Sequence, residues 1–244
     1  MVPFFNAYDD PQRALAYSKL NFPGTYYLAF RDLPAIFARH IQGRSALDFG
    51  CGAGRSTCFL KKLGFEAIGV DISTSMIEAA QGADPLGRYH LMRDGDFNIL
   101  DKLQFDLILS AFAFDNIPGA DWRVTLLSSL GNLLKNNGRI VLLGSTPDIY
   151  THEWTSFTTK DFLQNRNAKS GEEVQIVMKD TPDSRPVVDL IWFHSDYLNL
   201  FKSSGLELIE RYLPLGREDE PYEWQTETSI APWVIYVVAK ESSR

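Results

Sequence analysis

Hydrophobic and polar positions along this chain follow two patterns in turn. Short, nearly continuous apolar runs fall at residues 45–49, 67–71, 88–92, 105–110 and 139–143. Between them, helical spacing predicts amphipathic helices at residues 55–63, 73–80 and 121–134. Apolar strands that alternate with helices indicate a parallel sheet covered by helices on both faces. With right-handed crossovers, this pattern predicts a doubly wound α/β fold whose ligand crevice lies at the carboxyl ends of the strands.

The segments on either side of this core follow other patterns. Residues 9–42 have helical spacing that breaks at residues 21–24, so we expect an N-terminal helical lid near the mouth of the crevice. After residue 145 we expect loops and an inserted β-hairpin with strands at 173–179 and 187–193. A helix at 195–204 and two last strands complete a predicted seven-stranded, mostly parallel sheet. Those two strands are expected at residues 206–212 and 233–239.

The length of 244 residues suits a single domain. Its expected parts are a helical lid (1–43), a core (44–145), a loop and hairpin insertion (146–194) and a C-terminal helix with strands (195–244). The formal net charge of −7 argues against a bulk nucleic-acid binder. No apolar run approaches the roughly 20 residues of a membrane helix, and the N-terminus lacks the pattern of a signal peptide. We therefore expect a cytoplasmic protein, with no metal site among its scattered histidines.

The candidate chemistry lies where the first predicted strand ends. Asp48 precedes Gly50, Gly52 and Gly54, three glycines at alternate positions, and a helix follows them. Glycine permits a sharp turn and lets a ligand approach backbone N–H groups, and the first helical turn adds unpaired donors. Asp71 ends the second predicted strand, where a carboxylate can accept from both hydroxyls of a ribose. These features predict a nucleotide-type site.

Two details of the turn favour a cationic ligand over a dinucleotide. Arg55 stands where the third glycine of a dinucleotide-binding turn would lie. The carboxylate of Asp48 offsets the preference of the following helix N-terminus for a pyrophosphate, and it would favour an ammonium or sulfonium group. A nicotinamide-dependent oxidoreductase on a Rossmann sheet stays one alternative. A non-catalytic cofactor-binding scaffold protein is another.

At these motifs the chain resembles the class I S-adenosylmethionine-dependent methyltransferases, chiefly over residues 45 to about 145. Residues 47–54 resemble the first motif of that family, and residues 69–73 resemble its second motif. The resemblance implies a Rossmann-like fold, S-adenosylmethionine as cofactor and S-adenosylhomocysteine as product. It also implies that Asp48 belongs to the amino-group environment, that Asp71 binds the ribose, and that Ile72 contacts the adenine, with Met76 adding to that wall.

Two further motifs extend the resemblance. Residues 95–100 resemble the family's G-D-x-x-x-L, which implies that Asp96 accepts from the adenine amino group and that Phe97 offers a backbone contact. Asp94, two residues away, is a rival for the role of Asp96. Residues 105–112 resemble the fourth-strand motif, whose end at Ser110 and Ala111 would lie near the sulfonium.

The sequence says less about the methyl acceptor. Methyl transfer is an in-line displacement in which alignment in a dry pocket supplies much of the rate, so no catalytic residue type is obligatory. His152 is the candidate base because an imidazole titrates near neutral pH. Aromatic residues that follow the fourth predicted strand would form a cap over the acceptor. Such a cap suits a small organic acceptor, either a ring system or a cationic amine. N-, O- and C-methylation all stay open. The candidate substrate contacts are Tyr17, Phe112, Tyr150, Trp154 and Trp192.

Overall fold

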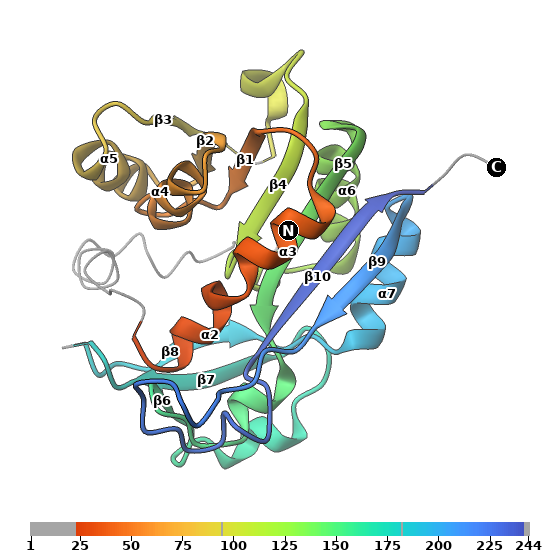
Figure 1. Ribbon diagram of the computed structural model, residues 1–244. Coiled ribbons are helices and arrows are strands. Elements are labelled where there is room, and N and C mark those ends of the chain that lie inside the picture. Colours follow the sequence, from red (N-terminus) through yellow and green to blue (C-terminus); the bar gives the residue numbers. More distant parts are fainter. Residues whose placement is uncertain (1–22, 94, 182, 242–244) are drawn as a thin grey trace.

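The computed structural model describes residues 23–93, 95–181 and 183–241, and its main feature is a seven-stranded sheet (Figure 1). The strand order is β3-β2-β1-β4-β5-β10-β9. The first five strands of this order pair in parallel, whereas β10 runs antiparallel to both β5 and β9. This arrangement confirms the predicted seven-stranded, mostly parallel α/β sheet. The strands are β1 (Ser45–Phe49), β2 (Glu66–Asp71), β3 (Arg88–Leu91), β4 (Phe105–Ala111), β5 (Leu134–Ser145), β9 (Leu206–Tyr212) and β10 (Trp233–Lys240).

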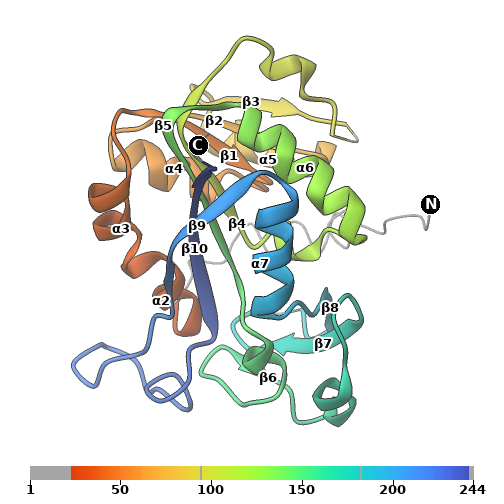
Figure 2. The same ribbon diagram turned by 90° about the vertical axis from the view of Figure 1, so that its right-hand side faces the viewer.

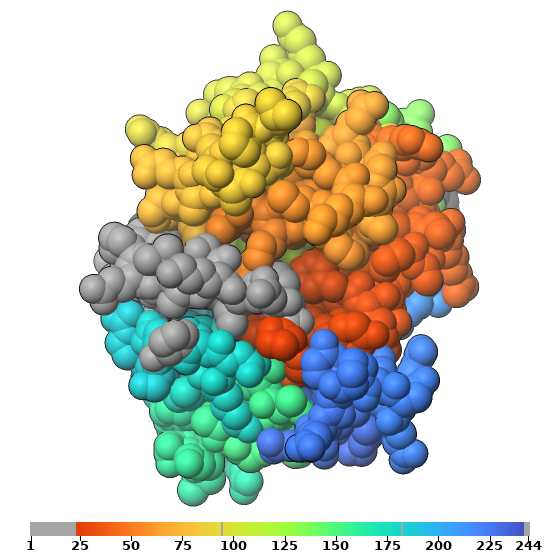
Figure 3. Space-filling view, turned by 60° about the vertical axis from the view of Figure 1, so that its left-hand side comes forward, coloured from red at the N-terminus to blue at the C-terminus, as the bar shows by residue number. Residues whose placement is uncertain are grey.

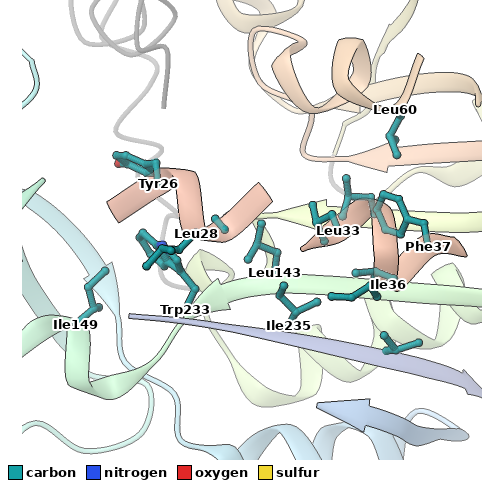
Figure 4. Packing of buried hydrophobic residues seen from close by; sticks show 14 of the residues in the cluster. Tyr26, Leu28, Leu33, Ile36, Phe37, Leu60, Leu143, Ile149, Trp233 and Ile235 are labelled. Atoms are coloured by element: carbon teal, nitrogen blue, oxygen red, sulfur yellow. The ribbon is translucent and has the colours of Figure 1, made fainter. Parts of the chain in front are cut away.

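Helices cover both faces of the sheet, and the twofold repeat of the strands decides which residues they meet. In β4, Leu107 and Leu109 belong to the cluster under the N-terminal helices, whereas Ile108 belongs to the cluster on the opposite face. Figure 4 shows Leu28 and Ile36 of the N-terminal helices beside the sheet residues Leu143 and Ile235. Figure 2 shows α6 and α7 together on the other face. The helices are α2 (Thr25–Arg31), α3 (Leu33–His40), α4 (Arg55–Lys62), α5 (Thr74–Ala83), α6 (Ala120–Asn132) and α7 (His194–Ser203).

After the break at residues 21–24, the sequence pattern predicts one helix of the lid. This stretch forms two helices, α2 and α3. Asp32 ends α2 and precedes α3, and Pro34 lies in the first turn of α3. Proline is tolerated in a first turn, but inside a continuous helix its ring would clash with the carbonyl group four residues earlier. The break at Asp32 therefore has a local cause. The part of the predicted lid before residue 23 lies outside the described residues.

Strand β5 begins at Leu134, five residues before the predicted start at residue 139. Leu134 pairs with Phe105 and Arg139 pairs with Leu107, so the extra residues are accommodated by a local irregularity of the register. A Cβ on Gly138 would lie 2.7 Å from the carbonyl oxygen of Phe105, which explains why a glycine is needed at this close approach. Residues 135–138 are polar or glycine, as is typical of a turn. The sequence pattern therefore does not reveal that the strand begins before residue 139.

The segment after β5 carries a separate three-stranded antiparallel sheet in the order β6-β7-β8. Strands β7 (Glu173–Met178) and β8 (Val187–Leu190) form the predicted hairpin. Strand β6 (Phe157–Thr158) pairs with β7, although this part of the chain was expected to be loop. A two-residue strand is too short to show a period, so sequence patterns do not reveal it. The short 3₁₀ helices η4 (Pro147–Tyr150) and η5 (Leu163–Asn167) complete this insertion.

One buried carboxylate joins the lid, the insertion and the loop that precedes β10. Glu227 is 0% exposed, and its Oε1 accepts hydrogen bonds from Thr25 Oγ1 at 2.6 Å and from the Thr155 N–H at 2.7 Å. Its Oε2 accepts from the backbone N–H groups of Gln225 and Thr226 at 2.9 and 3.1 Å. Figure 3 shows the red start of α2 against the blue loop that contains Glu227. This carboxylate therefore fixes the position of α2 on the domain.

Replacing Glu227 should lower stability strongly. The change Glu227→Ala leaves buried N–H and O–H donors without acceptors, so we expect the free energy of unfolding to fall by about 3 kcal/mol or more. Urea unfolding followed by circular dichroism measures this change. Glu223→Ala, which removes an exposed carboxylate of the same loop, is the matched control and should alter the free energy by less than about 0.5 kcal/mol. Equal effects of the two changes would contradict the bridging role.

Candidate functional site

A glycine turn connects β1 to α4 at the carboxyl edge of the sheet. Gly50, Gly52 and Gly54 have φ angles of 73°, 51° and 83°, a region that other residues rarely adopt. At Gly50 space is limiting as well, because an added Cβ would lie 2.2 Å from the Cβ of Ala113. The turn therefore packs directly on the segment that follows β4, and this contact brings two of the predicted motifs together.

Asp71 holds the turn from the end of β2. Its Oδ2 accepts from the Gly52 N–H at 2.8 Å, and its Oδ1 accepts from the Ser73 N–H at 2.9 Å. Ser73 caps α5 by accepting from the Met76 N–H at 3.4 Å. These two backbone donors orient the carboxylate. Asp71 ends β2, as predicted, and the structure places it beside the glycine turn.

Asp48 lies beneath the same turn and is 0% exposed. Its Oδ2 accepts from Ser56 Oγ at 2.7 Å and from Thr57 Oγ1 at 2.6 Å, so β1 is joined to the first turn of α4. Its Oδ1 is buried and has no hydrogen-bond partner in the described part of the chain. Burial raises the pKa of Asp48 to about 6, although the two hydroxyl bonds act in the opposite direction. A cation near this carboxylate would therefore be favoured.

A small hollow opens beside the turn. Four predicted residues line it, and the structure thus brings together Gly50, Gly52, Ala111 and Phe112. The other lining residues were not predicted as site residues: Phe30, Cys51, Ala53, Arg55 and Ser56. For Cys51, Ala53, Arg55 and Ser56, the only sequence signal of a site is that they lie within or next to the glycine motif. Phe30 belongs to the apolar stripe of α2, and that pattern does not distinguish a pocket wall from core.

Phe112 lines the hollow in an unusual backbone conformation. Its φ angle is +59°, and its N–H donates to the Leu143 carbonyl at 2.8 Å. Its ring packs edge-on against Trp233, Tyr26 and Phe30, with ring centroids 4.8, 5.8 and 6.3 Å away. A bulky residue rarely adopts a positive φ, and such strain persists where the surroundings hold it in place and is frequent at functional sites.

The residues predicted at the adenine end lie outside this hollow. Ile72 is 47% exposed, and Asp96 is exposed and caps the 3₁₀ helix η2 (Phe97–Leu100) by accepting from the Asn98 N–H at 3.0 Å. Phe97 stacks on the ring of Phe49. Met76 is 2% exposed, and its sulfur lies 4.0 Å from where a Cβ on Gly52 would stand, so it supports the turn from the protein side. Asp94 lies outside the described residues.

The predicted substrate residues Tyr150 and Trp154 are buried in the insertion. The Nε1 of Trp154 donates to the Ile149 carbonyl at 2.8 Å. The hydroxyl of Tyr150 donates to Asp189 Oδ2 at 3.2 Å, and burial raises the pKa of this phenol. Neither residue lines the hollow beside the turn, and their substrate role stays a prediction. Tyr17 lies outside the described residues.

Three other predicted residues lie near the carboxyl ends of the strands or in the insertion. Ser110 is 0% exposed, and its Oγ has no partner among the described residues. Trp192 covers the guanidinium of buried Arg123 at 3.9 Å, so its ring binds the insertion to α6. His152 lines a second hollow, which shares no lining residue with the first. Its role as a base stays a prediction.

Comparisons with known proteins find similarity to methyltransferases. Residues 47–140 match a family described as a methyltransferase domain. An uncharacterized methyltransferase of Bacillus licheniformis is 30% identical over 150 residues, which is 57% of this chain and 65% of that protein. A ubiquinone biosynthesis O-methyltransferase of Bradyrhizobium diazoefficiens is 29% identical over 147 residues, or 50% of this chain and 56% of that protein. The chain thus matches less than two thirds of the length of these curated relatives.

The fold has solved counterparts over nearly the whole chain. The CcbJ methyltransferase from Streptomyces caelestis superimposes with a TM-score of 0.66 at 18% identity, covering 96% of this chain and 98% of that one. At this identity the likeness concerns the fold alone. In the described residues, no helix is both long enough and apolar enough to cross a membrane.

Gly50 and Gly82 form a matched pair for testing the turn. Gly50→Ala places a Cβ against Ala113 at a positive φ, so we expect a loss of about 2 to 4 kcal/mol in the free energy of unfolding. Gly82 lies in α5 with open space around it, and Gly82→Ala should stabilise the protein by about 0.5 kcal/mol. Chemical unfolding of both variants measures the difference. A neutral Gly50→Ala variant would show that the turn does not need this close approach.

The raised pKa of Asp48 makes a pH-dependent prediction. The folded state holds its proton up to about pH 6 against an ordinary value of 3.8, so this group's contribution to stability falls as the pH rises between these values. The free energy of unfolding of the parent minus that of Asp48→Asn should therefore fall by about 2 kcal/mol from about pH 4 to pH 7. Urea unfolding at both pH values measures it. A difference that does not change with pH would contradict a raised pKa of the buried Asp48 carboxyl.

Proposed function

We propose that this chain is a class I S-adenosylmethionine-dependent methyltransferase, which transfers a methyl group from S-adenosylmethionine to a small-molecule acceptor; its residues 47–140 match a methyltransferase domain. The observation that carries the proposal is the pair of carboxylates under the glycine turn. Asp48 keeps a buried acceptor atom without a partner among the described residues, and Asp71 is oriented by the Gly52 N–H. Such a site favours a ligand with a positive charge near the turn and hydroxyl donors near the end of β2.

The residues present fit that ligand. S-adenosylmethionine supplies, when bound, an electrophilic methyl group on a sulfonium centre. We assign Asp48 and the backbone of Gly50, Gly52 and Gly54 to its amino-acid part, because the turn places no Cβ between the ligand and the main chain. We assign Asp71 to the ribose, since its carboxylate is held at the end of β2 beside the turn.

The adenine is assigned to the exposed residues that follow β2 and β3. Ile72 has 47% of its surface exposed, and a planar base would cover that apolar surface. Asp96 and Phe97 lie at the start of η2, where a carboxylate and a backbone group are within one short turn. We place Met76 behind the turn, as support for Gly52. Ser110 and Ala111, at the end of β4, are assigned to the neighbourhood of the transferred methyl group.

The acceptor is assigned to the aromatic side of the hollow. Phe30 and Phe112 form a wall from two distant parts of the chain, and Trp233 and Tyr26 hold Phe112 from behind. This wall excludes water and offers ring faces to a planar or cationic group, so it aligns the acceptor without a charged partner. The O-methyltransferase relative supports a small organic acceptor. We expect such an acceptor in the cytoplasm, because the described cysteines Cys51 and Cys58 are free thiols.

Calorimetry with S-adenosylhomocysteine tests the cofactor assignment. Asp71→Ala removes charge-assisted acceptors, so we expect the dissociation constant to rise about 10- to 100-fold. Asp101→Asn, an exposed carboxylate after η2, is the matched control and should leave binding unchanged. Binding of NAD(H) with no binding of S-adenosylhomocysteine would overturn the assignment in favour of an oxidoreductase.

Activity is tested separately, by S-adenosylhomocysteine release with a panel of small amines, phenols and aromatic acids. Phe112→Ala should reduce the rate with a responding acceptor while leaving S-adenosylhomocysteine affinity within about threefold, because the ring aligns the acceptor. Tight cofactor binding without methyl transfer to any metabolite in a cell extract would favour the non-catalytic alternative.

A further inference from the structure

The insertion contains a second hollow, of about 280 Å³, which lies away from the glycine turn. This volume is close to the lower end of the range of small-molecule sites, roughly 300 to 1,000 Å³. The segment that lines it runs from the end of η4 through β6 to η5. Figures 1 and 2 place this insertion at the opposite end of the molecule from α4. The lining residues are Tyr150, Thr151, His152, Glu153, Thr159, Lys160, Phe162, Leu163 and Arg166.

The net charge of this lining is opposite in sign to that of the whole protein. Lys160 and Arg166 are both exposed, and neither forms an ion pair within the described part of the chain. Glu153 is the one carboxylate among the lining residues. With His152 neutral, the lining therefore carries a net charge of +1 in a protein of net charge −7. A concave surface of one sign concentrates ligands of the opposite sign.

Glu153 is engaged with the protein and does not neutralise the two cations. Its Oε1 accepts from the Thr159 N–H at 2.6 Å and from Thr158 Oγ1 at 3.0 Å. Its Oε2 lies 4.0 Å from Lys179 Nζ. The hydrogen bonds and the Lys179 charge lower the pKa of Glu153 despite its partial burial. This carboxylate thus shapes the wall at β6, while Lys160 and Arg166 stay available to a ligand.

His152 adds a polar group that the fold has already oriented. Its Nδ1 lies 3.1 Å from the Asp148 carbonyl oxygen and 3.1 Å from Thr151 Oγ1, and these two contacts orient the ring. The apolar part of the lining comes from Phe162 and from Leu163, which is 64% exposed. An apolar group on a ligand would cover Leu163.

We propose that this second hollow binds a small amphipathic acid, with its anionic group at Lys160 and Arg166 and its apolar body against Phe162 and Leu163. Phosphate and carboxylate groups share this chemistry, and a guanidinium recognises either one through paired hydrogen bonds. The site is separate from the hollow beside the glycine turn, since the two share no lining residue.

Isothermal titration with phenyl phosphate tests the site on the full chain. We expect saturable binding at a single site, and inorganic phosphate and phenol, which each carry one half of the probe, should bind at least about tenfold more weakly. Titration with benzoate asks whether a carboxylate replaces the phosphate group. No binding of phenyl phosphate at about 1 mM would overturn the proposal. Equal binding of phenyl phosphate and inorganic phosphate would overturn the assignment of the apolar half.

Two double variants of equal charge locate the site. Lys160→Gln with Arg166→Gln should weaken phenyl phosphate at least about tenfold, because each cation contributes a charge-assisted contact. Lys169→Gln with Lys202→Gln removes the same charge from exposed positions outside the hollow and should change binding less than about twofold. If both double variants weaken the binding of phenyl phosphate equally, the probe is attracted by the overall charge of the protein. That result would overturn the proposed site.

A third variant and a competition measurement separate this site from the glycine turn. Leu163→Ser should weaken phenyl phosphate and leave inorganic phosphate unchanged, since only the apolar contact is lost. S-adenosylhomocysteine should bind all these variants with the affinity of the parent and should not compete with phenyl phosphate. Competition between the two would place the probe at the glycine turn and overturn the proposal, whether or not the methyl-transfer proposal holds. Circular dichroism confirms that each variant is folded.

Discussion

Two carboxylates under one glycine turn are the constraint on which the site depends. Asp48 binds the first turn of α4 through Ser56 and Thr57, and Asp71 binds the Gly52 N–H, so the turn is held from two strands at once. The charge of Asp71 also contributes to the raised pKa of Asp48. Two negative groups so close together, one of them fully buried, are costly unless a cation or donor groups compensate them. The fold therefore builds a preference for a positively charged ligand into the turn itself.

The wall facing this turn depends on contacts between distant parts of the chain. Phe30 comes from α2, Phe112 follows β4, and Trp233 begins β10, yet their rings form one cluster with Tyr26. Glu227 holds α2 in place, because it accepts from Thr25 and from Thr155 of the insertion. The aromatic wall and the buried carboxylate thus act together. The first shapes the hollow, and the second determines where the helix that carries Phe30 lies.

Two large rings of the insertion after β5 make contacts within the protein. Trp154 donates to a backbone carbonyl, and Trp192 covers the buried guanidinium of Arg123. Trp192 also donates to the Asp115 carbonyl at 2.8 Å, which links the insertion to the segment after β4. The exposed chemistry of the insertion lies in the second hollow, around Lys160 and Arg166. Packing and ligand contact are therefore divided between different residues of the same segment.

The sequence by itself determined the alternating strands and helices, the glycine turn after Asp48, the position of Asp71 at the end of the second strand, and the hairpin of the insertion. Each of these features is encoded by the spacing and the turn residues of its own segment. Only the tertiary structure decided that Asp71 accepts from the Gly52 N–H, that Phe30 lines the hollow, and that Phe112 takes a positive φ. Apolar periodicity marks such residues as buried but not as neighbours of a ligand. Their roles depend on contacts between distant segments, and some of these are more than 200 residues apart, such as Thr25 with Glu227. No local pattern records such contacts.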